Sequence, residues 1–291
     1  MRKFKISTRI ARRMQGLEKQ EPAAEKRPEP VAAPPASRGN GLRVTSRSDV
    51  GLVRRENQDA VILGAGLMGI ADGMGGHKGG ETASAGARDG MIQALEGKEP
   101  AQTTLEEAVK AVNLALWNQQ EGNDDLQGMG TTLSLLWPAG ERILMAHVGD
   151  SRIYLLREGV LRQVSRDHSI VADMVRKGLL TEEQAAVHPM RNYITRAVGS
   201  EPTVQVDLAA FERQAGDRWL ICSDGLYSQI TKSALEEAAQ TEDLETAADR
   251  LLQAALEGGG KDNISLILMA EEKENETEAD SDETKAGEAE A

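Results

Sequence analysis

Apolar residues recur with helical spacing in two early stretches of the chain. Between Thr104 and Gln120 an apolar side chain returns every three or four residues, which predicts an amphipathic helix. The positions concerned are Leu105, Ala108, Val109, Val112 and Leu116. Thr104 and Glu107 have the spacing of a capping box at its start. Residues 80–95 predict a second helix just before it.

Short apolar runs follow these helices and predict β-strands. They cover residues 132–137, 142–148, 152–156, 204–211, 218–223 and 264–269. Several are separated by short turns containing glycine, proline or charged residues, and such short turns favour antiparallel pairing. Helices and strands are partly segregated along the chain. The pattern therefore predicts an α+β domain built around a sandwich of sheets.

The hydrophobic pattern is confined to residues 41–270, which we predict to form one domain. Residues 1–40 hold ten Lys/Arg and four Asp/Glu, and their second half is rich in Pro, Ala and Glu, as in a disordered linker. The first 20 residues are either a mobile tail or a short helix on a membrane surface or partner. Residues 271–291 hold ten acids and predict a disordered acidic tail.

Composition narrows the function classes. Aromatic residues make up 3% of the chain, so the core must be aliphatic, and the single cysteine, Cys222, falls in an apolar run as a core residue would. No run of about 18 apolar residues and no signal peptide is visible, so we expect no transmembrane span and a cytoplasmic protein. A net charge of −13 argues against nucleic acid as the main ligand. It suits a protein that gathers carboxylates around hard cations.

Five aspartates stand beside glycine, asparagine or a turn at the edge of an apolar run. They are Asp59, Asp72, Asp150, Asp224 and Asp262. An aspartate at a strand end projects a short, rigid carboxylate, and a following glycine lets the backbone turn toward a cation. Taken singly, each segment is an ordinary turn, because Asp-Gly is a common turn sequence. Their order and flanking residues carry the information.

The ordered set of motifs resembles the bacterial type of the PP2C (PPM) family of protein phosphatases. The set runs R-x-x-N-x-D from Arg54, A-D-G-M-G-G from Ala71, G-M-G-T-T from Gly128, V-G-D-S-R from Val148, S-D-G-L from Ser223 and D-N at Asp262. The resemblance covers about 44–270. It implies a PP2C-like sandwich of two antiparallel β-sheets flanked by α-helices, with metals in a cleft at one edge.

The resemblance also implies a role for each matching residue. Asp59, Asp72, Asp224 and Asp262, with the Gly73 carbonyl, would ligate a binuclear Mn²⁺ or Mg²⁺ centre, and Asp150 would join Asp224 at a third, weaker metal. Arg54 would bind the substrate phosphate, for which its planar fork is suited. Asn263 would support the turn at Asp262. The chemistry implied is two-metal hydrolysis, in which a water shared by the cations attacks phosphorus in line.

Several positions depart from the family pattern or extend it. Met74 stands where many eukaryotic relatives have a histidine that is a candidate general acid. The proton donor to the leaving group would then be His77 or a metal-bound water. The alternative for His77, an exposed loop residue without a catalytic role, is equally well supported. Gln58 replaces a glutamate found in some relatives. Arg191 lies in a stretch, 169–191, that corresponds to a flap beside the cleft and would touch substrate, unless it is ordinary surface. His147 fits a core position.

The function implied is dephosphorylation of phosphoserine and phosphothreonine in proteins, with a Hanks-type kinase and its targets as partners and a monomeric enzyme. A non-catalytic PP2C-like binding module is the alternative, and loss of metal aspartates would favour it. All five positions are present. A third possibility is an enzyme of the same fold that acts on a single anti-sigma-factor-antagonist phosphoprotein, although such domains usually accompany sensor domains.

Overall fold

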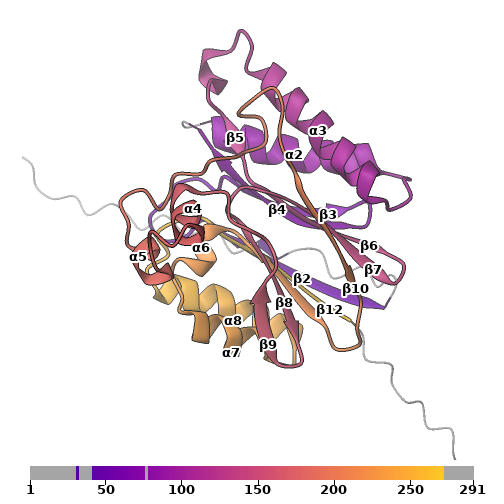
Figure 1. The fold of residues 1–291 in the computed structure, drawn as a ribbon, viewed down its shortest axis with the longest axis vertical. Coiled ribbons are helices and arrows are strands. Elements are labelled where there is room, and N and C mark those ends of the chain that lie inside the picture. The colour runs from indigo at the N-terminus through magenta and orange to yellow at the C-terminus, as the bar shows by residue number, and fades with distance from the viewer. Residues whose placement is uncertain (1–30, 33–40, 76–77, 272–291) are drawn as a thin grey trace, which may run out of the picture.

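Two antiparallel sheets pack face to face in the computed structural model, with helices on both outer faces (Figure 1). The structure describes residues 31–32, 41–75 and 78–271. The order of layers is helices, sheet, sheet, helices, so the predicted fold class is confirmed.

The first sheet has the strand order β1-β2-β12-β11-β8-β9. Every neighbouring pair is antiparallel. The strands are β1 (Val31–Ala32), β2 (Leu42–Asp49), β8 (Arg152–Arg157), β9 (Val160–Gln163), β11 (Arg218–Cys222) and β12 (Ile264–Glu271). Helices α7 (Lys232–Ala239) and α8 (Leu244–Glu257) cover its outer face.

The second sheet has the order β10-β7-β6-β4-β3, and the short β5 pairs with the end of β4. Its strands are β3 (Asp59–Gly64), β4 (Leu67–Met74), β5 (Gly130–Thr131), β6 (Leu133–Ala139), β7 (Arg142–Val148) and β10 (Asp207–Glu212). Helices α2 (Gly79–Leu95) and α3 (Gln102–Gln119) cover it. The 3-10 turn Asp124–Leu126 follows α3, and three short helices, α4 (Ile170–Arg176), α5 (Glu182–Ala186) and α6 (Asp224–Tyr227), gather at one end of the sandwich (Figure 1).

The core consists of three apolar layers, one between the sheets and one under each pair of helices. Strand β11 contributes to two of them, because Trp219 and Ile221 face the other sheet while Leu220 and Cys222 face the helices. A strand covered on both faces is a continuous apolar run, as its sequence shows. Cys222 is fully buried, so its predicted place in the core is confirmed.

The tryptophans occupy different layers. Trp137 lies under α2 and α3, whereas Trp219 lies between the sheets with the ring of Phe211 set edge-on against it, 5.2 Å between centroids. Trp117 is partly exposed on α3. Apart from these rings the three layers are almost wholly aliphatic, as the composition requires.

The predicted capping box at Thr104 is wrong. Helix α3 begins at Gln102 with Ala101 as its N-cap, and no side chain caps it. Thr104 and Glu107 therefore lie inside the helix, where the spacing of a capping box has no orphan amide to satisfy. The predicted strand 204–211 also begins later, at Asp207.

The predicted tails lie almost entirely outside the described residues, so the boundaries 1–40, 41–270 and 271–291 remain predictions. The exception is Val31–Ala32, which pairs with Ser48 and Arg47 at the edge of the first sheet. Among the helices that the structure describes, none combines the length and apolarity needed to cross a bilayer.

Leu251 tests the layer under α8, because its side chain is fully buried. Replacing it with alanine removes apolar contacts and leaves a cavity, so we expect Leu251→Ala to lower the free energy of unfolding by about 2–5 kcal/mol. Urea denaturation measures this. Leu114→Ala on α3, where leucine is 47% exposed, is the matched control and should shift the free energy by about 0.5 kcal/mol or less.

Candidate metal centre

The five predicted aspartates all stand at strand ends. Asp59 is the first residue of β3 and Asp72 lies near the end of β4. Asp150 follows β7, Asp224 follows β11 as the first residue of α6, and Asp262 precedes β12. In an antiparallel pair the start of one strand lies beside the end of its neighbour. The fold therefore brings together residues that are up to about two hundred positions apart.

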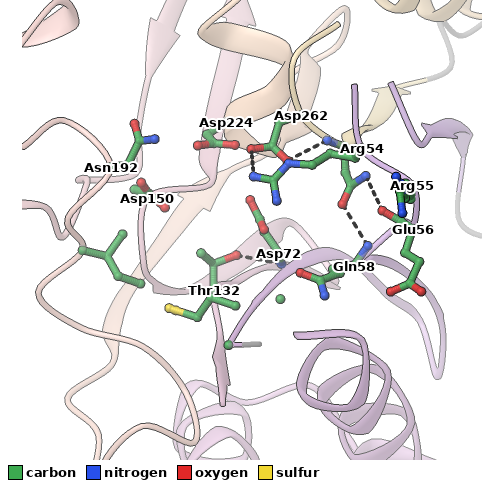
Figure 2. A pocket seen from close by; sticks show the side chains of 15 residues that line it. Arg54, Arg55, Glu56, Gln58, Asp72, Thr132, Asp150, Asn192, Asp224 and Asp262 are labelled. Atoms are coloured by element: carbon green, nitrogen blue, oxygen red, sulfur yellow. Dashed lines mark hydrogen bonds and ion pairs between the residues drawn. The ribbon is translucent and has the colours of Figure 1, made fainter. Parts of the chain in front are cut away.

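A pocket of about 580 Å³ opens where these strand ends meet. Asp72, Asp150, Asp224 and Asp262 line it (Figure 2). Asp59 pairs directly with Asp72 across β3 and β4, and its carboxylate accepts a hydrogen bond of 2.8 Å from Ser223 Oγ. The backbone of Gly73 also lines the pocket. All residues predicted as metal ligands are thus in or directly beside one cavity.

The carboxylates raise one another's pKa. Burial and the neighbouring carboxylates raise the pKa of Asp224 to about 8. Burial and Asp262 raise the pKa of Asp59 to about 6, and burial and Asp167 raise that of Asp150 to about 6. Burial and the other four aspartates raise the pKa of Asp72 well above its usual range. Directly opposed like charges on neighbouring strands destabilise a sheet. The site therefore carries an excess of negative charge that a cation would offset.

The donor set fits hard divalent cations, which take oxygen ligands. Among the described residues no three His, Cys, Asp or Glu side chains converge closely enough to chelate an ion as they stand. The carboxylates instead surround the cavity. Arg54 lies among them, and its Nη2 donates to Asp262 Oδ2 at 2.7 Å (Figure 2).

Glycine flanks three of these aspartates, for two different reasons. A Cβ on Gly73 would overlap the Gly80 carbonyl oxygen, and one on Gly225 would overlap the carbonyl oxygen of Asn263. Close backbone approach, not an unusual turn, therefore requires glycine after Asp72 and Asp224. Gly149, which precedes Asp150, has a φ of +108°, a backbone conformation that favours glycine.

Asn263 joins the Arg54 loop to the strand that carries Asp262. Its Oδ1 accepts from the amide of Gln58 at 2.9 Å, while its Nδ2 donates to the carbonyls of Val50 and Glu56 at 3.0 and 2.9 Å. Its own amide donates to Asp262 Oδ1 at 2.9 Å. One side chain thus fixes the loop that supplies Arg54 against the end of β12.

The family model described as protein phosphatase 2C matches residues 46–268. The chain belongs to the protein phosphatase 2C family. The matched range contains all five aspartates and lies within the predicted domain 41–270, and the resemblance seen in the motifs is confirmed.

Several relatives of this phosphatase 2C chain bear names of serine/threonine phosphatases. PstP of Mycobacterium tuberculosis is 43% identical over 230 residues, which are 78% of this chain and 44% of PstP, so the chain spans about half the length of that relative. The serine/threonine phosphatase stp of Listeria monocytogenes is 37% identical over 77% of this chain and 93% of its own.

Solved structures extend the likeness to the phosphatase 2C fold. The crystal structure of Mycobacterium tuberculosis PstP/Ppp superposes with a TM-score of 0.75 at 43% identity, over 79% of this chain and 99% of that one. The catalytic domain of PstP in complex with two manganese ions gives a TM-score of 0.73 at 41% identity, over 79% and 97% of the two chains.

The remaining predicted residues are placed unequally. His147 is fully buried, as expected of a core histidine. Arg191 is exposed and does not line the pocket, although its neighbour Asn192 does. The stretch 169–191 folds into α4 and α5 with connecting turns. His77 lies outside the described residues. Roles in catalysis or substrate binding for Arg191 and His77 stay predictions.

Sequence reasoning assigned no role to several residues that line the pocket. Arg55, Glu56, Thr132, Asn192 and Ile194 all do so. Thr132 could have been predicted from the sequence, because it belongs to the family motif G-M-G-T-T. Its Oγ1 accepts a hydrogen bond from the amide of Asp72 at 2.9 Å. Asn192 and Ile194 carry no such signal, since they follow the two short helices and reach the pocket through tertiary packing alone.

The raised pKa values predict how pH acts on the metal-free protein. Folded Asp224 has a pKa of about 8 against an ordinary 3.8, so its ionisation opposes folding, and stability present below about pH 4 is lost as pH rises to 8. In EDTA, Asp224→Asn should therefore unfold at a higher temperature than the native chain at pH 8, and the gap should narrow toward pH 5. Calorimetric scans across this range measure it. A gap that does not change with pH would contradict the prediction.

Asn263→Ala should loosen the metal centre while leaving every aspartate in place. The Arg54 loop loses its hydrogen bonds to the side chain beside Asp262, and loss of such outer partners typically weakens metal affinity by about 10–100-fold. Calorimetric titration with Mn²⁺ measures the affinity. Asn123→Ala, which removes an exposed cap of the Asp124–Leu126 turn, is the matched control and should leave it unchanged.

Proposed function

We propose that this protein is a metal-dependent phosphatase that hydrolyses phosphoserine and phosphothreonine in proteins. One observation carries the proposal: in a phosphatase 2C chain, the arginine of the R-x-x-N-x-D motif and four aspartates line the same pocket. The names of the relatives, which are serine/threonine phosphatases, support the same activity. A non-catalytic binding module would have no use for so many carboxylates held together against their repulsion.

Asp59, Asp72, Asp224 and Asp262, with the Gly73 carbonyl, would hold a binuclear Mn²⁺ or Mg²⁺ centre. The manganese complex of PstP supports this assignment. Asp150 and Asp224 would hold a third, weaker cation. When bound, such ions supply Lewis-acid charge that lowers the pKa of water and offsets charge on a phosphoryl group.

Arg54 is the group that binds the substrate's phosphate. Its side chain is 51% exposed at the pocket, and Asp262 holds one end of the guanidinium, so the other donors can face a phosphoryl oxygen. A planar, permanently charged fork gives both attraction and orientation. Charge that develops on these oxygens in the transition state would be stabilised by the same donors.

Cys222 takes no part as a nucleophile. It is fully buried, and burial raises the pKa of its thiol to about 12, so little thiolate exists at neutral pH. The proposed mechanism is hydrolysis by water, which needs no covalent phosphoenzyme. His77, or a water, would donate the proton to the leaving serine or threonine oxygen, and Arg191 would contact the protein substrate beside the pocket.

The cellular setting follows from the chemistry of the substrate. Phosphoserine and phosphothreonine in proteins are made by protein kinases, so the partners would be phosphorylated proteins, among them a Hanks-type kinase and its targets. We place this activity in the cytoplasm of a bacterium, in a monomeric enzyme. The acidic chain makes nucleic acid an unfavourable partner.

The central test is hydrolysis of a phosphothreonine peptide with and without Mn²⁺. We expect activity that EDTA abolishes and that Asp224→Asn reduces by at least about 10²-fold, because the variant loses a carboxylate of the metal centre. Arg54→Ala should lower kcat/KM by about 10²-fold, because the phosphate loses a hydrogen-bond donor. The kcat/KM of Arg54→Lys should lie between those of Arg54→Ala and wild type.

Arg55→Ala is the matched control, since Arg55 lies next in sequence at the pocket rim and has no assigned part in the chemistry. It should retain most activity. Circular dichroism must show that each variant is folded. The proposal would be overturned if folded wild-type protein released no phosphate with either Mn²⁺ or Mg²⁺.

A further inference from the structure

The turn that carries Asp150 is held by hydrogen bonds from residues outside the metal centre. The amide of Gly149 donates to His168 Nδ1 at 3.0 Å, and the amide of His168 donates back to the Gly149 carbonyl at 2.8 Å. From α6, Tyr227 Oη donates to the Asp150 carbonyl at 3.0 Å. His168 and Tyr227 therefore fix the two carbonyls on either side of Asp150's amide.

The hydrogen bonds of His168 define which of its nitrogens carries the proton. A backbone amide can only donate, so Nδ1 must be the accepting nitrogen and the proton is on Nε2. Nε2 lies 3.1 Å from Asp207 Oδ2, to which it donates. Arg196 Nη1 lies 2.9 Å from the same nitrogen and donates to Asp207 Oδ1 at 2.7 Å. Asp207 thus orients the ring so that Nδ1 faces Gly149.

His168 is itself held tightly. Its side chain is only 5% exposed, and its carbonyl accepts from the amide of Thr195 at 2.7 Å. The next residue, Ser169, forms an isolated bridge with Ile194, which lines the pocket. His168 therefore stands at the base of the segment that contains α4 and α5, with little freedom to move.

The Gly149 turn has little room to adjust by itself. Its φ of +108° belongs to a region that glycine favours, and a Cβ there would come within 2.6 Å of Thr132 Cβ. The Gly149 backbone leads directly into Asp150, so its orientation contributes to where the Asp150 carboxylate lies. Removing the acceptor at His168 would free the Gly149 amide, which belongs to the peptide between Val148 and Gly149, and would loosen the turn that leads into Asp150.

We propose that His168 is a positioning residue for Asp150, and that it sets the affinity of the third, weaker cation. The ring does not line the pocket and acts through the Gly149–Asp150 turn. The proposal rests on the proposed function, which assigns that cation to Asp150 and Asp224. Its effect should be selective, because the other aspartates come from β3, β4 and the loops after β11 and before β12, which His168 does not hold.

Mn²⁺ binding to the full chain tests the proposal, counted by the electron paramagnetic resonance signal of the free ion. We expect His168→Ala to bind the first two ions as wild type does and the third at least about tenfold more weakly. His168→Asn should restore much of the affinity, since its Oδ1 can accept from Gly149 where Nδ1 did. His147→Ala is the matched control, because that ring is also buried, lies tilted against His168 with 5.1 Å between centroids, and forms its hydrogen bonds with Ser134 and Arg166 instead.

The proposal would be overturned if folded His168→Ala bound the third Mn²⁺ ion as tightly as wild type. It would also be overturned if His147→Ala weakened binding of the third ion equally, because that would indicate a general loss of packing. Should wild type bind only two ions, the third-metal assignment fails, and a crystal structure of His168→Ala then decides the positioning role alone. A Val148–Gly149 peptide rotated from its native orientation, with Asp150 displaced, supports the role; an unchanged turn refutes it.

Discussion

Mutual repulsion among carboxylates is the constraint on which the rest of this structure depends. Asp59 and Asp72 oppose each other across two strands, and Asp224 joins them from the other sheet with its pKa raised to about 8. Such a cluster resists folding unless a large core holds its supports in place. Three separate apolar layers do so, and each aspartate is attached to a strand that is anchored in them.

The supports around the cluster are as specific as the carboxylates. Ser223 donates to Asp59 and accepts from the amide of Ser265, which links the two sheets at the pocket. Asn263 binds the Arg54 loop, and His168 binds the Gly149 turn. Each support uses a neutral group, so it fixes geometry without cancelling the charge that attracts cations. The division between charged ligands and neutral positioning groups explains how the site can be both rigid and strongly negative.

The sequence sufficed for part of what depends on local pattern; helices α7 and α8 were not predicted, although the buried residues of α8 recur at helical spacing. Apolar periodicity located α2, α3 and most strands between residues 132 and 270, and the motif order located the aspartates, because each motif is a short contiguous segment. Strands β2 to β4 were not predicted: β3 and β4 hold only short apolar runs beside Asp59 and Asp72, and β2 mixes apolar residues with polar and charged ones such as Arg43 and Arg47. Functional residues fall between the usual helical and strand patterns.

What the sequence could not provide are contacts between distant residues. Nothing in the neighbourhood of His168 signals that its ring accepts from Gly149, 19 positions away, or that Asp207 orients it. Likewise, the reason for glycine at 73 and 225 is the approach of Gly80 and Asn263, which only the packed fold reveals. Turn chemistry is local and can be read from sequence, whereas close approach is a property of the assembled layers.

The placement of the tryptophans gives the molecule built-in optical reporters of separate regions. Trp137 senses the layer under α2 and α3, Trp219 senses the interface between the sheets, and Trp117 faces solvent on α3. Emission from the two buried indoles should lie at shorter wavelength than that of the third. Single-tryptophan versions of the chain would therefore show whether the sheet–sheet interface and the helical cover come apart together or in sequence, without any added dye.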